Sequence, residues 1–161
     1  MCSLNLIDLD DDCLLHIVSF LELPDLLNFE RVCCRTQEIA RIVYKKFSNF
    51  HLRLREAFGQ SEKILSSIGE FIEFLQFSLG FGINKDIKMG ILEDISKFCP
   101  NMHTIKLQYF SLNTEERVTH LEPLSKCKSL RTIIFQACDT PRENLRNYDK
   151  LKHLKFVFER I

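Results

Sequence analysis

The sequence predicts a mixed α/β protein in which a small bundle of three helices is followed by a short array of parallel strands with helices on its convex side. Two observations predict this order. The first part of the chain carries apolar residues at helical spacing, and the rest repeats a short apolar frame every 21 to 30 residues. A third observation, 45% hydrophobic and 27% charged residues, indicates that the chain can bury a core. The predicted domains are residues 1–46 and 47–161.

The first helix is predicted from Leu14, Ile17, Val18 and Leu21, which follow the i, i+3, i+4, i+7 spacing of one helix face. The acidic residues 10–12 come directly before it. Negative charge is favoured there because the first N–H groups of a helix are unpaired and its dipole is positive.

Two shorter helices are predicted next. A helix rarely continues through the residue before a proline, so Pro24 separates the first helix from a second one that begins at residue 24 or 25. The third begins near Cys33, and its apolar side is predicted to hold Ile39, Ile42 and Val43.

The rest of the chain repeats an apolar-x-x-apolar-x-apolar frame. The frames start near residues 47, 72, 102, 130 and 151, at intervals in or near the roughly 20–29 residues of stacked strand repeats. The last two apolar residues of each frame alternate along a short strand, so both are expected to face the core. Before the frames at 102 and 130, apolar residues recur at helical spacing, which predicts helices between parallel strands.

Charge and hydropathy exclude several classes of protein. Lys plus Arg (22) equals Asp plus Glu (22), which argues against a dedicated nucleic-acid binder. Residues 8–12 are too acidic for the apolar core of a secretory signal, and the most apolar stretch, 71–83, is too short to span a bilayer. We therefore expect a protein of the cytoplasm or nucleus that binds neither nucleic acid nor membrane.

Nothing in the sequence indicates a cofactor, a metal or a catalytic centre. The seven cysteines include no C-x-x-C pair, and the five histidines are scattered, so small buried thiols are the preferred interpretation. The short segment 80–82 lacks the context of a phosphate-binding loop. No pattern that lowers a thiol pKa is recognised, and the prediction is that the protein is not an enzyme.

Three segments of the first domain, 9–21, 23–27 and 31–35, together resemble an F-box. The residues that match the family pattern in register are Leu9, Leu14, Ile17, Leu21, Leu23, Pro24, Leu26, Leu27, Val32, Cys33 and Arg35. The sequence departs from the pattern at Asp10, where the family has proline, and at Thr36, where it has tryptophan. Both departures are expected to weaken binding to a partner.

The F-box resemblance implies a substrate-recognition adaptor of an SCF-type E3 ubiquitin ligase, which docks onto a Skp-family adaptor and a cullin scaffold. Such docking lays helix faces against an apolar surface of the partner. The residues implied to bind the Skp-family adaptor are Leu9, Leu14, Ile17, Leu21, Leu23, Pro24, Leu26, Val32 and Cys33.

The second domain resembles the cysteine-containing leucine-rich repeats that often follow an F-box. Cys99 and Cys127 each precede a frame by three residues, and Cys138 falls at the ninth position of its frame. This class of repeat accepts Asn or Cys at that position to bond backbone groups in the turn. Phe110 and Gly80 hold the same position elsewhere, which indicates a short and degenerate solenoid.

The side chains between the core positions of such strands face the concave side, where repeat proteins commonly bind ligands. The residues predicted to bind a target protein are Phe74, Gln76, Lys106, Gln108, Ile134, Gln136 and Lys155. The alternative is a leucine-rich-repeat scaffold outside any ligase, in which the F-box-like helices only cap the solenoid. Association with a Skp-family adaptor distinguishes the two.

Overall fold

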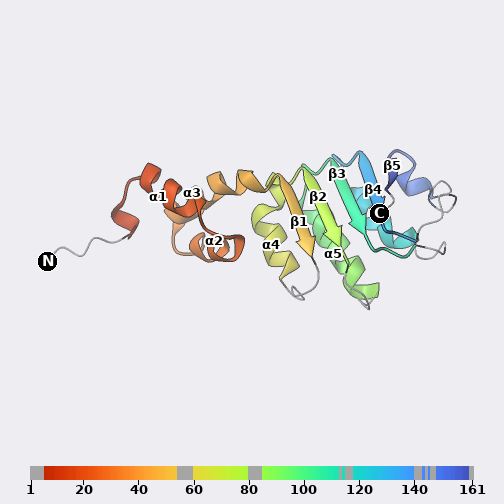
Figure 1. Cartoon of the computed structure of the whole chain (residues 1–161), viewed down its shortest axis with the longest axis horizontal. Coiled ribbons are helices and arrows are strands. Elements are labelled where there is room, and N and C mark those ends of the chain that lie inside the picture. The colour runs from red at the N-terminus through yellow and green to blue at the C-terminus, as the bar shows by residue number, and fades with distance from the viewer. Residues whose placement is uncertain are drawn as a thin grey trace. The chain divides into compact units, whose positions relative to one another are not determined.

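The computed structural model describes residues 6–53, 60–79, 85–112, 114, 118–139, 143, 145 and 148–159. The chain divides into two compact units, Met1–Lys46 and Phe47–Ile161, which are described separately (Figure 1). Gly80 lies outside the described residues. Among the helices of the described part, none combines the length and the apolar character needed to cross a membrane.

In its described part, residues 6–46, the first unit contains a 3-10 helix and three α-helices. Their bounds are Leu6–Asp8 for η1, Asp11–Ser19 for α1, Leu23–Phe29 for α2 and Cys34–Tyr44 for α3. The sequence supplies the starting points: Asp10 caps α1 by accepting a hydrogen bond from the Cys13 N–H at 2.7 Å, and Pro24 lies in the first turn of α2.

The core of this unit forms around α3. Its buried side chains recur at the spacing of one helix face and are Thr36, Ile39, Ala40, Val43 and Tyr44. They are joined by Leu14 and Val18 of α1 and by Leu26 and Leu27 of α2. The prediction that Ile42 lies on the buried side is wrong, because this side chain is exposed. It directly precedes the buried Val43, but consecutive residues of a helix are rotated by about 100° about its axis.

Polar contacts tie the three helices together. Arg35 Nη2 donates to the Leu9 carbonyl and to Asp11 Oδ1, both at 2.6 Å, which joins the start of α3 to the start of α1. The Tyr44 hydroxyl donates to Glu30 at the end of α2. Burial, followed by this hydrogen bond, raises the pKa of Tyr44.

The second unit alternates strands with helices. Its strands are β1 (Asn49–Arg53), β2 (Phe74–Ser78), β3 (Thr104–Gln108), β4 (Thr132–Gln136) and β5 (Lys155–Glu159). Its helices are α4 (Ser61–Ile68), η3 (Gly69–Phe71), α5 (Lys85–Phe98), η4 (Thr119–Lys126) and η5 (Asp149–Leu151), and η2 (Lys45–Phe47) precedes β1. The helix predicted before residue 130 is a 3-10 helix, consistent with Pro123 inside it, which lacks a backbone N–H.

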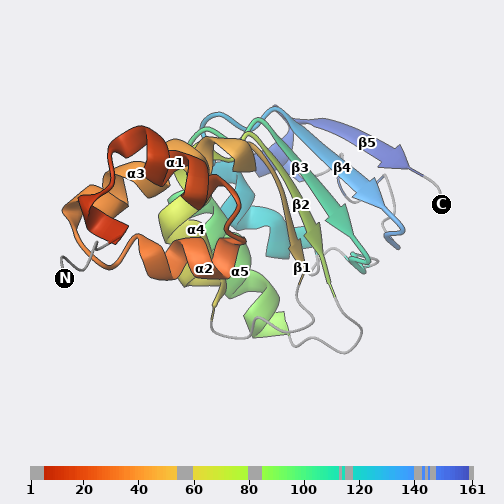
Figure 2. The ribbon, with the colours of Figure 1, turned by 60° about the vertical axis from the view of Figure 1, so that its left-hand side comes forward.

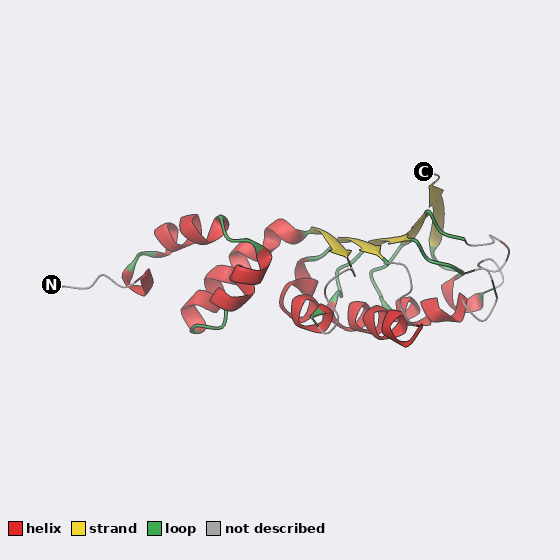
Figure 3. Cartoon of the chain, turned by 60° about the horizontal axis from the view of Figure 1, so that its bottom comes forward, coloured by secondary structure: helices red, strands yellow, loops and turns green. Residues whose placement is uncertain are grey.

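The five strands form one parallel sheet in the order β1-β2-β3-β4-β5, which confirms the predicted parallel arrangement. Figure 2 shows the strand directions turning gradually along the sheet, as β-sheet twist requires. Figure 3 shows the helices of this unit together on one face of the strands. The side chains of β2, β3 and β4 that face these helices are buried: Leu75, Phe77, Ile105, Leu107, Ile133 and Phe135.

The register of β5 corrects the last predicted frame. Ile133 pairs with Phe156 and Phe135 pairs with Phe158, so the core positions of β5 are Phe156 and Phe158. The frame therefore starts at residue 153 and not at 151. Leu151 and Leu154 are also buried, but before the strand begins, and they produced the same apolar spacing by chance.

Candidate partner-binding surfaces

The first unit carries several large apolar side chains on its surface. They are Leu6, Ile17, Phe20, Val32 and Ile42, and the most open are Phe20 at 75% and Val32 at 60% exposure. Ile17 and Phe20 are three residues apart at the end of α1, so they lie on the same side of the helix. Apolar side chains exposed next to one another, as Ile17 and Phe20 are, are typical of a surface that a partner covers.

The residues predicted to bind a Skp-family adaptor divide into a surface group and a core group. Ile17, Pro24, Val32 and Cys33 are exposed, whereas Leu9, Leu21 and Leu23 are half-buried. Leu14 and Leu26 are buried, with 1% and 0% exposure, so their assignment as contacts is corrected. Leu14 and Leu26 pack in the core of the unit. A buried core leucine and an exposed contact leucine have the same apolar spacing in the sequence, so the pattern does not distinguish them.

Phe20, Leu6 and Ile42 were not predicted as contacts, although all three are exposed. Phe20 lies two residues past the last buried position of α1, and its ring meets the His16 ring edge-on at 5.1 Å. Ile42 was predicted to be buried because it directly precedes the buried Val43, and Phe20 directly precedes Leu21, which belongs to the predicted apolar face of the first helix.

The two departures from the F-box pattern have structural roles in this chain. Asp10 is the N-cap of α1, and the hydrogen bond from the Cys13 backbone lowers the pKa of its carboxyl. Thr36 is buried, and its Oγ1 accepts from the Cys33 N–H at 3.0 Å and donates to the Cys33 carbonyl at 2.8 Å. Both residues therefore stabilise helix starts, and their effect on partner affinity stays a prediction.

The described cysteines are only partly the buried thiols that the sequence predicted. Cys99 and Cys127 are buried, and burial raises their pKa to about 12 and about 11. Cys13, Cys33 and Cys34 are exposed instead. The hydrogen bond from the Thr36 backbone at the start of α3 lowers the pKa of Cys33, which the sequence pattern did not predict.

The second candidate surface is the face of the sheet opposite the helices. Its side chains form three rows across the strands, set by the pairing register. The first row is Asn49, Phe74, Thr104, Thr132 and Lys155; the second is His51, Gln76, Lys106, Ile134 and Val157; the third is Arg53, Ser78, Gln108, Gln136 and Glu159. All seven residues predicted to bind a target lie in these rows, and Lys155 shares a row with Phe74.

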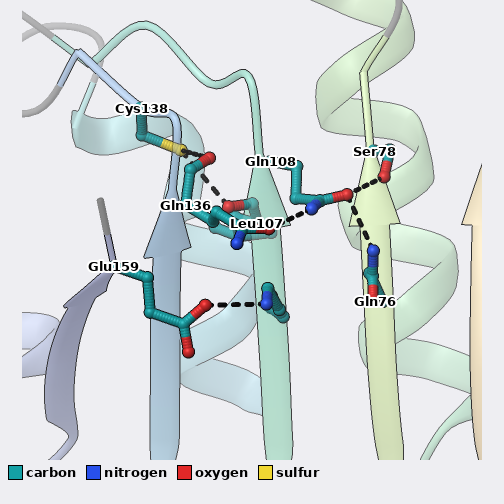
Figure 4. A network of polar contacts seen from close by, with 8 residues as sticks. Gln76, Ser78, Leu107, Gln108, Gln136, Cys138 and Glu159 are labelled. Atoms are coloured by element: carbon teal, nitrogen blue, oxygen red, sulfur yellow. Dashed lines mark hydrogen bonds and ion pairs between the residues drawn. The ribbon is translucent and has the colours of Figure 1, made fainter. Parts of the chain in front are cut away.

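Hydrogen bonds join the side chains of neighbouring strands on this face (Figure 4). Gln76 Nε2 donates to Gln108 Oε1 at 2.8 Å, and the Ser78 hydroxyl donates to the same oxygen. Gln108 Nε2 in turn donates to Gln136 Oε1. These bonds hold the amides in one orientation, so the face is organised before any partner arrives.

His51 and Arg53 extend this network onto β1. Arg53 Nε donates to His51 Nδ1 at 3.2 Å, so the neutral ring carries its proton on Nε2 and donates to Ser78 Oγ at 2.7 Å. Burial, with a smaller effect of the Arg53 charge, lowers the pKa of His51. His51 and Arg53 were not predicted as contacts, because the residues of β1 match the apolar frame only weakly.

Lys106 Nζ on the central strand β3 forms an ion pair with Glu159 Oε2 on β5 at 2.7 Å. Glu159 was not predicted because the last frame was placed two residues too early. Its row position follows only from the observed register.

Cys138 bonds backbone groups at the turn after β4, as predicted. The Phe110 N–H donates to its Sγ at 3.4 Å, and the Leu107 and Gln136 carbonyls lie 3.2 and 3.3 Å from the sulfur. The thiol has one proton, so it donates to one of the two carbonyls at a time. This sulfur links the ends of β3 and β4.

Comparison with known proteins identifies the first unit. Residues 6–48 match the family model of the F-box domain, and this match supports the interpretation of the chain as an F-box protein. F-box domains typically bind adaptors of the Skp family within cullin-based complexes. No curated protein matches the chain.

Proposed function

We propose that this protein is the substrate-recognition adaptor of an SCF-type E3 ubiquitin ligase, binding a Skp-family adaptor through its F-box and a target protein through its sheet. The observation that carries the proposal is the F-box match at residues 6–48 on a unit whose surface exposes Ile17, Phe20 and Val32. In this proposal the chain has no catalytic role, and its place of action is the cytoplasm or the nucleus.

The exposed side chains suit helix-in-groove or helix-on-surface docking. Ile17 and Phe20 lie at the end of α1 and Val32 lies in the bend before α3, and all three side chains are exposed, whereas Leu14 and Leu26 are buried. Apolar anchors at the centre of such interfaces each contribute about 2 kcal/mol or more, which is roughly a 30-fold change in Kd.

We further propose that the second unit is a short leucine-rich-repeat array that presents its open face to the target. The parallel strands in sequential order, their in-register apolar positions and the backbone bonds of Cys138 support this assignment. The open face combines amides and both charge signs with apolar Phe74, Ile134 and Val157, a mixture suited to a protein surface.

The first test is co-purification with a Skp-family adaptor. The intact chain is expected to be captured, and Val32→Asp and Phe20→Lys are each expected to weaken capture roughly 30-fold. Both positions are exposed, so each variant should keep the circular dichroism spectrum of the intact chain. Gln60→Asp, at an exposed position in the other unit, is the matched control and should bind normally.

The outcomes separate the adaptor proposal from its alternative. Failure of the intact, folded chain to bind the adaptor at micromolar concentrations removes the ligase assignment and leaves the repeat scaffold. Equal capture of the intact chain and both variants shows that a different surface binds. Leu14→Asp is not a suitable probe, because a charge buried in the core disrupts the unit itself.

The role of the sheet is tested by comparing the proteins captured with variants of its open face. Ile134→Lys should lose a target that binds there, while Glu93→Lys, on an exposed position of α5, should retain it. A target that both variants capture equally contradicts the assignment of the open face.

A further inference from the structure

Strand β5 is the last strand of the sheet, and among the described residues only β4 pairs with it. Figure 1 shows β5 at one end of the row of strands. The backbone N–H and C=O groups along the outer side of such a strand can pair with another chain.

The core side of β5 is incompletely covered. Phe156 and Phe158 align with Ile133 and Phe135, yet both phenylalanines are partly exposed whereas their neighbours have 0% and 2% exposure. Phe158 stacks on Phe135 at a ring distance of 5.4 Å. Apolar area at this end of the sheet therefore remains in contact with solvent.

The sequence of β5 is symmetric in its chemistry about Val157. It reads Lys-Phe-Val-Phe-Glu from Lys155 to Glu159. If two copies pair antiparallel about Val157, Lys155 of each copy lies opposite Glu159 of the other, and Phe156 lies opposite Phe158. Parallel pairing in the same register would place lysine beside lysine and glutamate beside glutamate.

We propose that β5 is the interface of a symmetric homodimer, in which the β5 edges of two copies pair antiparallel and join the two sheets into one. Opposite charges and aromatic side chains directly across an antiparallel pair both stabilise it. The contact is isologous and closes on itself, because each copy uses the same strand. This proposal concerns the second unit and does not depend on the F-box assignment.

The faces of the sheet agree with this pairing. Lys155, Val157 and Glu159 belong to the open face, and Phe156 and Phe158 to the core face. A twofold axis perpendicular to the sheet keeps the open faces of both copies on one side and their core faces on the other. Lys155 and Glu159 of the two copies therefore meet on the open face, and Phe156 and Phe158 meet on the core face. Lys155 is exposed and forms no ion pair among the described residues.

Glu159 can take part in this contact without leaving Lys106. Its carboxylate accepts from Lys106 at 2.7 Å through Oε2, and a carboxylate has further acceptor positions. The lysine of the second copy would then complete a row in which Glu159 lies between two cations.

The charges of β5 also differ from those of a protected edge. Edge strands avoid unwanted pairing through proline, bulges or charges that repel a second copy. β5 contains no proline, and its two charges have opposite signs at symmetric positions. They favour self-pairing in one register and one direction.

The test is the oligomeric state of the full chain, measured by sedimentation equilibrium across the micromolar range at low salt. The intact chain is expected to form a dimer. Lys155→Glu converts both charge pairs into glutamate–glutamate pairs and should raise the dissociation constant about tenfold or more, and Glu159→Lys should do the same with lysines. Lys128→Glu, at an exposed loop position, carries the same charge change and should leave the dimer intact.

The register is tested by mixing the two variants. Copies with Lys155→Glu and copies with Glu159→Lys are each expected to be monomeric, but a mixed pair restores both glutamate–lysine contacts and should dimerise. A monomeric intact chain, a dimer insensitive to Lys155→Glu, or mixed variants that stay monomeric would each overturn the proposal. Open-ended assembly that grows with concentration would do so as well, since it requires two different edges.

Discussion

The close approach of α4 to α5 depends on a glycine. Gly69 follows the last residue of α4 and is buried. A Cβ at this position would lie 2.4 Å from the carbonyl oxygen and 2.8 Å from the carbonyl carbon of Phe98, the last residue of α5. The φ of Gly69 is −59°, which any residue adopts, so the requirement for glycine is steric.

We predict that Gly69→Ala destabilises the second unit. Both clashing atoms belong to the backbone, so no side chain can rotate away, and the end of α5 must move. Overpacking of this kind costs about 1–3 kcal/mol. A methyl group in a well-packed interior has no compensating space, and we expect a value in the upper part of this range.

Gly90 provides a matched control within α5. A Cβ built there meets no heavy atom within 4 Å, so Gly90→Ala should stabilise the helix by about 0.8–1 kcal/mol through helix propensity. The two substitutions are chemically identical, and their effects on the free energy of unfolding should have opposite signs and differ by about 2–4 kcal/mol.

The assay is urea denaturation followed by circular dichroism, with the midpoints and slopes of both variants compared with those of the intact chain. Equal stability of Gly69→Ala and the intact chain would refute the steric argument. So would a loss of stability in Gly90→Ala as large as that in Gly69→Ala, because it would indicate a general sensitivity of this helix pair.

Two further predictions follow from the shifted pKa values. Because the pKa of Cys33 is lowered and that of Cys13, beside the Asp10 carboxylate, is raised, iodoacetamide at neutral pH should alkylate Cys33 faster; mass spectrometry of timed samples measures this, and equal rates would contradict it. The folded protein lowers the pKa of His51 below its ordinary value of about 6.5, so its stabilising contribution is present above that pH and is lost as the pH falls further. His51→Gln should remove this part of the pH dependence in urea titrations between about pH 7.5 and 5, and an unchanged dependence would exclude His51 as its source.

Several elements of the second unit were predictable because local pattern and tertiary environment agree there. In β3, Ile105 and Leu107 alternate with polar residues. In β4, Ile133 and Phe135 hold the same two frame positions before a turn that contains Cys138. Helix α5 was recognised from its apolar periodicity. Helix α4 was not, since its large apolar residues are only Ile64, Leu65 and Ile68, too few to show a clear period.

The sequence by itself determined the periods that orient side chains, which are two in the central strands and 3.6 in the helices. It likewise determined the helix starts at the N-cap Asp10 and at Pro24 in the first turn of α2. It also carried the F-box pattern. These features are local, because they depend on residues a few positions apart.

Only the tertiary structure decided which apolar side chains are covered. Leu14 and Ile17 share one pattern on α1, but the former is core and the latter surface, because exposure depends on where a neighbouring helix packs. The register of β5 likewise depends on its pairing with β4, and Glu159 reaches Lys106 only through that register. Contacts between residues distant in sequence are set by packing and pairing, which periodicity does not encode.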